Sequence, residues 1–260
     1  KHFMEKEIHQ QPSVLINTIS SLIQKDVDIN ISPEKLNIKE NHGITICAAG
    51  TSHYAAMVGK YWIEKFASIP VNVELSSEYR YRNPVNTMYS SMIVISQSGE
   101  SIDTLMAMRE AKRLNLKTTA IINVENSTID READYSIYTN VGPEVGVAST
   151  KSFTSQLIVL LSIAMKIALF NNKINTVYYT DFIKNLKLIP NFMSKMLSLN
   201  DEFVKLAQSI KSSKNVLYLG RGLLYPLALE GALKLKELSY IHSEGFAAGE
   251  MKHGPIALIE

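Results

Sequence analysis

Residues 91–112 of this chain, SMIVISQSGESIDTLMAMREAK, decide the fold. Residues 92–95 form an apolar run typical of a buried strand, and Leu105, Met106 and Ala111 then follow at helical spacing. Between them lies a polar run that consists of Ser96, Gln97, Ser98, Gly99, Glu100 and Ser101. A buried strand that passes to a helix through so many hydroxyl groups needs a chemical reason.

Four more apolar segments have the length and composition of strands, and helical patterns lie among them. They are residues 43–50, 71–75, 117–124 and 134–139, with the sequences GITICAAG, VNVEL, KTTAIINV and DYSIYT. Strands that alternate with helices at this spacing favour right-handed crossovers and a parallel sheet. The sequence therefore predicts an α/β fold with a doubly wound, five-stranded parallel sheet and flavodoxin-like layering.

The rest of the chain divides into an arm, a linker and a repeat. We expect residues 1–40 to form a helical arm, residues 41–170 the sheet domain, and residues 171–213 a helical linker with a break at Pro190. The first pattern then returns, because NVLYLGRGLLYPLALEGALKLKELSY repeats the strand, glycine turn and helix of GITICAAGTSHYAAMVGKYWIEKFA. Residues 214–260 are predicted to begin a second similar domain, with one strand, one helix and a strand-like end at HGPIALIE.

Composition argues against several classes of protein. With 260 residues, 46% hydrophobic and 20% charged, the chain reads as a globular protein with ample core. Its 27 basic residues are scattered among 25 acidic ones, so no basic stripe predicts nucleic-acid binding. No group of Cys, His and Asp has metal-ligand spacing, so we expect no metal and no other cofactor.

Location is predicted from the cysteine count and from hydropathy. The single cysteine, Cys47, cannot form an internal disulfide, which suits a reducing cytoplasm. The most apolar helix, SQLIVLLSIAMKIALF at residues 155–170, is interrupted by Ser162 and Lys166 and is too short in pure hydrocarbon to span a bilayer. The N-terminal residues have no apolar signal core. We therefore expect a cytoplasmic protein without a membrane partner.

Three segments place small hydroxyl residues where a strand or loop meets a helix. They are Gly50-Thr51-Ser52, the run from Ser96 to Ser101, and Val147-Ala148-Ser149-Thr150. Ligands of open parallel sheets bind at the carboxyl ends of the strands, where helix N-termini favour anions. The alternative interpretation is that the hydroxyls are N-caps, since Ser and Thr are preferred there.

Three such segments in one sheet favour a phosphate site over capping alone. Ser96, Ser98 and Ser101 can surround a phosphoryl group, Gly99 lets the backbone approach it, and Gln97 offers an amide to a neighbouring sugar hydroxyl. The chain has neither a Walker loop nor the glycine spacing of a dinucleotide fingerprint.

A second group of charged side chains lies in ALEGALKLKELSYIHSEGFAAGEMKHGPIALIE, residues 228–260. Lys234 and Glu237 are three residues apart on one helix face, within reach of each other. The spacing alone favours a solvated ladder of ion pairs that runs from Glu230 through Lys234 to Glu237. His253 precedes Gly254-Pro255 at a helix end or tight turn, where a structural role is the more common one.

The motifs together resemble a known family. CAAGTS, SQSGES.DT, GVASTKSFTSQ, LGRG..YPLALEGALKLKE.SYIH.E and GE.KHGP.ALI are similar, in order and spacing, to the sugar-isomerase (SIS) half of the glucosamine-6-phosphate synthases, the glutamine–fructose-6-phosphate aminotransferases. The resemblance covers nearly the whole chain. It implies two SIS domains, each with a five-stranded parallel sheet.

The resemblance also implies roles for single residues. Ser96, Gln97, Ser98 and Ser101 would hold the sugar phosphate, although Ser101 replaces the more usual threonine. Thr51 and Ser52 would contact the same ligand, and Val147 (through its backbone) and Ser149 would contact sugar hydroxyls. Glu237 would move a proton between C1 and C2, assisted by Lys234. His253 would open the sugar ring in the neighbouring subunit of a homodimer.

Two further parts of the family are expected outside this sequence. HFMEKEI..QP resembles the segment that joins the glutaminase domain to the isomerase domain, so that domain is an expected partner within the same parent chain. The family's C-terminal tail carries a Schiff-base lysine. The complete reaction, from fructose 6-phosphate and glutamine-derived ammonia to glucosamine 6-phosphate, would belong to the parent protein.

Two other functions are compatible with parts of the pattern. A different SIS enzyme, either a sugar-phosphate isomerase or a deglycase of fructosamine phosphates, would share the serine-rich loop. It would not need ALEGALKLKE followed by KHGP. A non-catalytic SIS sensor of amino-sugar phosphates would normally bring a DNA-binding helix-turn-helix, and none precedes the first strand.

Overall fold

The computed structural model describes residues 2–25, 27–38, 42–85 and 88–259. Its largest sheet has five strands, in the order β4-β3-β5-β6-β7, and every neighbouring pair is parallel. The strands are β3 (Gly43–Ala48), β4 (Val71–Leu75), β5 (Tyr89–Ser96), β6 (Lys117–Ile122) and β7 (Tyr135–Tyr138). This order is that of flavodoxin-like doubly wound folds, so the predicted α/β class and the five strands are confirmed.

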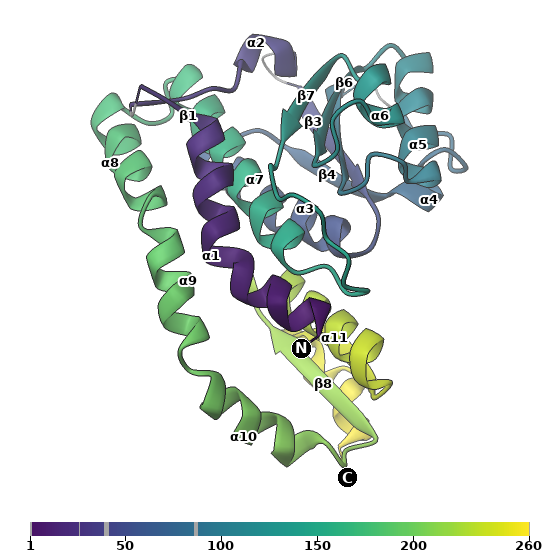
Figure 1. The fold of residues 1–260 in the computed structure, drawn as a ribbon. Helices are drawn as coiled ribbons and strands as arrows, with labels where there is room; N and C mark the ends of the chain where they lie inside the picture. Colours follow the sequence, from purple (N-terminus) through teal and green to yellow (C-terminus); the bar gives the residue numbers. More distant parts are fainter. Residues whose placement is uncertain (1, 26, 39–41, 86–87, 260) are drawn as a thin grey trace.

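The sheet is covered by helices on both faces (Figure 1). On one face Ile44 and Ile46 of β3 pack with two long helices, and on the other face Cys47 and its neighbours pack with shorter ones. The first face carries α3 (Gly50–Trp62), its π-helical continuation η1 (Ile63–Ala67) and α7 (Lys151–Phe170). The second carries α4 (Ser76–Tyr79), α5 (Ile102–Arg113) and α6 (Thr128–Glu132). Alternate residues of each central strand thus reach opposite cores, as a doubly wound sheet requires.

The helix α7 is long and apolar enough to cross a membrane, by length and composition only, so the expectation that it is too short is wrong. The helix begins at Lys151 and not at Ser155, which adds a full turn. It is the one such helix in the described part of the chain, and 61% of its apolar window is buried inside the fold. Its partners are α3, η1 and the arm helix α1 (Phe3–Leu22). Those partners account for its hydropathy, because they cover it as core.

The arm is packed against the sheet domain. Leu15, Ile19 and Leu22 of α1 belong to the same apolar core as α7. A small antiparallel pair, β1 (Ile23–Gln24) with β2 (Asp28–Ile29), and the short helix α2 (Pro33–Leu36) follow. The expected boundary between residues 40 and 41 lies outside the described residues.

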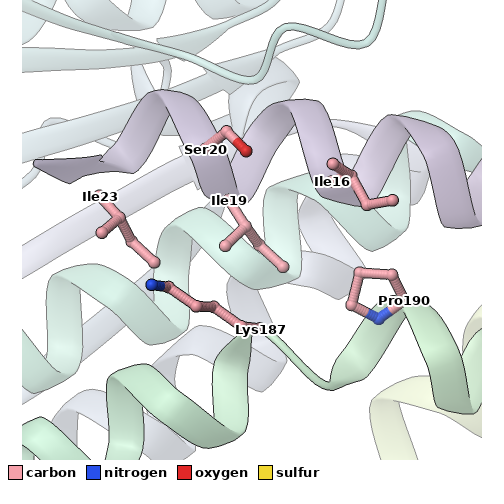
Figure 2. A pocket seen from close by; sticks show the side chains of 6 residues that line it. All are labelled: Ile16, Ile19, Ser20, Ile23, Lys187 and Pro190. Carbon is pink, nitrogen blue, oxygen red and sulfur yellow. The ribbon is translucent and has the colours of Figure 1, made fainter. Parts of the chain in front are cut away.

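The linker consists of α8 (Thr176–Leu186), α9 (Ile189–Leu197) and α10 (Asn200–Ile210). Pro190 lies in the first turn of α9, where a missing N–H is tolerated, so the predicted break falls between α8 and α9. α9 also packs on α1. A pocket of about 340 Å³ lies at this junction, lined by Ile16, Ile19, Ser20, Ile23, Lys187 and Pro190 (Figure 2).

The second unit repeats the strand, turn and helix of the first, as the sequence predicts. It consists of β8 (Asn215–Gly220), α11 (Leu224–Ser239) and β9 (His242–Ala247), and β8 pairs with β9 in parallel. The expectation of a single strand is therefore wrong. The sequence did not reveal β9, because HSEGFA has one large apolar residue and no strand-like pattern. The expected strand-like end is also wrong. Pro255–Leu258 form a short 3-10 helix, η3, because Pro255 fixes the backbone angle at its start.

The two units meet through their helices. α11 packs against α3, which brings the second unit beside the sheet domain (Figure 1). The 3-10 helix η2 (Ala248–Lys252) follows β9 and leads to His253. This contact between α3 and α11 sets the geometry of the candidate site.

Candidate functional site

The three hydroxyl segments gather at the carboxyl end of the sheet. β3 and β5 are neighbours, so the loops that follow them lie side by side, and the segment before α7 reaches the same place. Together they enclose a pocket of about 200 Å³. Its lining residues are Ala49, Thr51, Ser52, Ile95, Ser96, Gln97, Ser98, Ser101, Thr104 and Ser149.

The capping interpretation of these hydroxyls is wrong for the three helices concerned. α3 has Ala49 as its N-cap residue. Ser101 at α5 and Thr150 at α7 occupy the N-cap positions without a side-chain capping hydrogen bond. Helix N-termini also leave their first N–H groups without intrahelical partners, so α5 directs donors toward the pocket.

Gly99 shapes the turn between β5 and α5. Its φ angle is +67°, and a Cβ atom there would lie 2.0 Å from Oγ of Ser127. The amide of Gly99 donates to Oγ of Ser96 at 3.1 Å, and its carbonyl accepts from the amide of Ile129 at 3.0 Å. Only glycine has both the backbone freedom and the small size that this turn needs.

Glu100 is the one acidic residue of the serine-rich loop, and it points away from the pocket. Its carboxylate accepts a hydrogen bond from the backbone amide of Thr128 at 2.7 Å. That hydrogen bond holds the pKa of Glu100 below its ordinary value. The carboxylate therefore supports the start of α6 and does not oppose an anion in the pocket.

Three pocket hydroxyls accept a hydrogen bond from the protein and so keep their own proton for a bond to a ligand. Oγ of Ser98 accepts from the amide of Glu100 at 3.2 Å, and Oγ of Ser101 accepts from Oγ of Ser96 at 3.4 Å. Oγ of Ser52 accepts from Nε2 of Gln156 at 3.0 Å. Because a hydroxyl has one proton to donate, these three groups can still donate it to an anionic ligand.

Two other hydroxyls already donate a hydrogen bond to a carboxylate of the protein. Oγ of Ser149 donates to Oε2 of Glu144 at 3.0 Å, and Oγ1 of Thr51 donates to Oε1 of Glu230 at 3.1 Å. Ser149 can therefore only accept from a ligand, so it suits a sugar hydroxyl rather than a phosphate oxygen. The pocket thus has three hydroxyls that can donate to a ligand and one, Ser149, that can only accept.

The charged group on α11 adjoins this pocket. Nζ of Lys234 lies 2.7 Å from Oε2 of Glu237 and 3.5 Å from Oε1 of Glu230, and it donates to Oγ1 of Thr51 at 2.9 Å. The side chains of Glu230, Lys234 and Glu237 are 8%, 17% and 31% exposed. The interpretation as a solvated ladder is therefore wrong, because the packing of α11 on α3 covers it.

Glu230 was not predicted as a site residue, although its spacing to Lys234 was the available signal. Burial raises its pKa to about 7, against the opposing effects of Lys234 and Thr51. Its Oε2 atom is buried and has no hydrogen-bond partner within the described residues. A carboxyl group that titrates near neutrality beside a lysine and a second carboxylate can hold or release a proton.

Glu144 is a second residue that the sequence pattern did not reveal. Besides Ser149 it accepts from the backbone amides of Thr150 at 2.9 Å and Ser152 at 3.3 Å. It thus caps α7 with a carboxylate from the preceding loop. Its position in GPEVG carries no capping signature, because the loop must fold back to bring it there.

Four predicted site residues do not line the pocket, and of these Lys234 and Glu237 belong to the adjoining charged group, whereas Val147 and His253 do not. Val147 is 91% exposed, and His253 is exposed at the end of η2. Throughout the residues that the structure describes, no three His, Cys, Asp or Glu side chains gather to hold a metal ion.

Comparisons with known proteins agree on one family. The model of the SIS domain matches residues 37–166 and 209–260. The glutamine–fructose-6-phosphate aminotransferases (isomerizing) of Zymomonas mobilis and Bradyrhizobium diazoefficiens are 47% and 48% identical over 261 and 262 residues. Each match covers 100% of this chain and 43% of the relative, so the chain spans less than half of these relatives.

Solved structures agree as well. The C-terminal domain of glucosamine-fructose-6-phosphate aminotransferase from Francisella tularensis has a TM-score of 0.96 and 42% identity. The match covers 100% of this chain and 73% of that chain. Tagatose-6-phosphate ketose/aldose isomerase from Escherichia coli shares the fold with a TM-score of 0.77 at 20% identity, and the match covers 100% of this chain and 70% of that chain.

Proposed function

This chain belongs to the SIS domain family, and we propose that its serine-lined pocket binds the phosphate group of fructose 6-phosphate. The proposed role is that of the isomerase region of a glutamine–fructose-6-phosphate aminotransferase, the name that its relatives carry. The parent protein would convert fructose 6-phosphate and glutamine-derived ammonia to glucosamine 6-phosphate.

The observation that carries the proposal is the division of the pocket hydroxyls into donors and an acceptor. Ser98, Ser101 and Ser52 have protons to donate, and the N-terminus of α5 adds backbone donors beside them. Ser149 can only accept. A sugar phosphate matches this division, with its anion at the serine loop and a hydroxyl at Ser149. Ser96 is nearly buried and supports the loop, and Gln97 also lines the pocket.

The proposed chemistry lies on α11. Glu237 removes a proton from C1 of the open-chain sugar derivative and returns one at C2, which converts the ketose skeleton to the aldose. Nζ of Lys234 lies 2.7 Å from Oε2 of Glu237 and holds this carboxylate in place. Glu230 shares the same lysine, and its pKa near 7 allows it to exchange a proton with the pair. Thr51 joins this group to the pocket.

Further parts of the proposal concern partners and location. His253 would act in the site of a second copy, which makes a homodimer the expected assembly. The glutaminase domain of the parent chain would supply ammonia, and a Schiff-base lysine from the C-terminal tail would hold the ketose. Val147 would contact the sugar through its backbone. The unpaired, buried Cys47 suits a cytoplasmic protein.

Calorimetry with matched ligands tests the binding proposal. Fructose 6-phosphate and glucosamine 6-phosphate should bind, and unphosphorylated fructose should bind at least about tenfold more weakly, because it offers no anion to the serine loop. Inorganic phosphate should compete with the sugar phosphates. Equal affinity for fructose and fructose 6-phosphate would refute the phosphate site.

One observation favours an isomerase over a non-catalytic phosphosugar sensor. A sensor needs the serine loop but has no need for two carboxylates and a lysine that are largely withdrawn from solvent beside it. Exchange of the C1 proton of fructose 6-phosphate with deuterated water, followed by NMR on the full-length protein, separates the two functions. A sensor would bind the sugar without exchange.

A further inference from the structure

Two buried charged residues hold the loop that carries Ser149. Glu7 on the arm helix α1 is 4% exposed, and Lys151 at the start of α7 is 3% exposed. α1 runs alongside α7 (Figure 1), and the loop between residues 139 and 150 lies against both. Buried charges are costly unless they are paired or hydrogen-bonded, so their partners show what they support.

The carboxylate of Glu7 binds the backbone of the loop. Its Oε1 atom accepts from the amide of Val145 at 2.6 Å, and both of its oxygens lie 3.1 Å from the amide nitrogen of Gly146. A Cβ atom at Gly146 would lie 2.4 Å from Oε2 of Glu7. The carboxylate thus occupies the space that any other residue at position 146 would need.

Lys151 binds the earlier half of the same loop. Its Nζ atom donates to the carbonyl of Pro143 at 2.6 Å and lies 3.5 Å from that of Val141. It also donates to Oε1 of Gln10 on α1 at 3.2 Å. The arm and the loop are therefore joined by hydrogen bonds from both directions.

The segment 145–149 connects the contacts of Glu7 to the pocket. We call these contacts, from Glu7 to the amides of Val145 and Gly146, the latch. Glu7 holds the segment at Val145 and Gly146, and Glu144 holds it at Ser149. We propose that Glu7 is a positioning residue that fixes Ser149, the acceptor of the pocket. The position of the arm helix then sets the affinity for the sugar hydroxyl, while binding of the phosphate group is independent of it. This inference rests on the proposed function.

Glu7→Gln tests the proposal with little change in shape. The amide keeps one acceptor but places an NH₂ group against backbone N–H groups, so the segment 145–149 loosens. We expect roughly three- to tenfold weaker binding of fructose 6-phosphate, the range for one hydrogen bond. Binding of inorganic phosphate should not change, because Ser98 and Ser101 are untouched. Gly146→Ala should reproduce this pattern from the opposite side of the contact.

A double-mutant cycle with Ser149→Ala separates positioning from general destabilisation. If Glu7 acts through Ser149, Glu7→Gln should cause no further loss of affinity in the Ser149→Ala background. Additive losses, or equal losses for inorganic phosphate and fructose 6-phosphate, would overturn the proposal. Glu5→Gln, at an exposed carboxylate of the same helix, is the matched control and should bind both ligands normally.

Hydrogen exchange keeps the inference testable if the proposed function fails. Glu7→Gln should speed exchange of the amides of Val145, Gly146 and Thr150 at least about tenfold, without change in β5. If the unmodified chain binds no sugar phosphate, the proposed function fails, and this measurement alone decides whether Glu7 holds the loop. Unchanged exchange at Thr150 would show that the latch does not reach the pocket.

Discussion

The two strand–turn–helix units have the same backbone and different chemistry. β3 leads to α3 through Gly50 at φ +55°, and β8 leads to α11 through Gly222 at φ +57°. After the glycine the first unit has Thr51 and Ser52, whereas the second has two leucines. The first unit therefore offers hydroxyls at its turn, and the second offers none there.

The second unit instead carries its polar groups along the body of its helix. Glu230, Lys234 and Glu237 lie in the middle and later turns of α11, where the first unit has Val58, Trp62 and Lys65 at the matching places. The contact between α3 and α11 brings the two sets together at Thr51. A repeated scaffold can thus divide binding and acid–base chemistry between its copies, and four changes test that division.

The largest effect is expected at the chemical end of the comparison. Glu237→Gln keeps the shape of the side chain but removes the base, which typically costs roughly 100- to 10,000-fold in rate. Formation of glucosamine 6-phosphate by the full-length protein, with fructose 6-phosphate and glutamine supplied, is the measurement. Glu202→Gln in the exposed helix α10 is the control. Near-normal turnover of Glu237→Gln would make this carboxylate structural.

The next effect is expected at the turn of the serine loop. Gly99→Ala should destabilise the fold in two ways. A non-glycine residue in a left-handed backbone conformation costs about 1–2 kcal/mol, and the overlap of the new Cβ atom with Ser127 costs about 1–3 kcal/mol. We expect the free energy of unfolding to fall by roughly 3 kcal/mol in urea titration. Gly50→Ala has nothing within 4 Å of the new Cβ and should lose only the backbone part. Equal losses for both variants would contradict the close contact.

The unfolding free energy, measured over a series of pH values, tests the shifted pKa of Glu230 in the second unit. Glu230 has a pKa of about 7 in the folded chain and an ordinary value of 4.5, so the folded state binds its proton more tightly. Its contribution to stability is complete below pH 4.5 and is lost as the pH rises through 7. Relative to Glu230→Gln, the unfolding free energy should fall by about 3 kcal/mol across that range.

Other shifted carboxyl groups do not interfere with this measurement. Hydrogen bonds and lysines lower the pKa of Asp28 and Asp134, although burial opposes them. Their contributions are present above their ordinary value of 3.8 and are lost only as the pH falls. A flat difference between the unmodified chain and Glu230→Gln from pH 4.5 to 7 would show that Glu230 is ionised throughout.

The smallest effect is expected at a single hydroxyl of the binding side. Ser98→Ala removes one donor to the phosphate and should weaken fructose 6-phosphate binding by roughly 1.5 kcal/mol, about tenfold in Kd. Calorimetry measures it, with Ser239→Ala at the exposed end of α11 as control. Unchanged affinity would move the phosphate away from the serine loop.

Local sequence patterns were enough for the sheet and for most of the pocket. The five strands are apolar runs, and parallel strands share one carboxyl edge, so the sequence alone could place Thr51, Ser96 and Ser98 together. β9 was missed because His242–Ala247 has too few apolar residues to stand out from a loop. Its pairing with β8 depends on the intervening helix and not on its own composition.

Burial caused by packing between distant segments could not be predicted. The spacing of Glu230 and Lys234 fits a solvent-exposed helix face as well as a buried charged group. Only the contact of α11 with α3 decides between these two interpretations. Glu7 lies in a helix with ordinary polar residues around it, and its partners are about 138 positions away in the chain. No local pattern records such a contact.

The packing of α7 has a consequence for how the chain is made. α1 and α3 leave the ribosome before α7, yet both bury their apolar faces against α7, which ends at residue 170. One face of the sheet therefore stays open until most of the domain has been synthesised. Such long-range contacts form slowly, and the exposed intermediate is prone to aggregate. We therefore expect the nascent chain to expose this apolar face until α7 emerges.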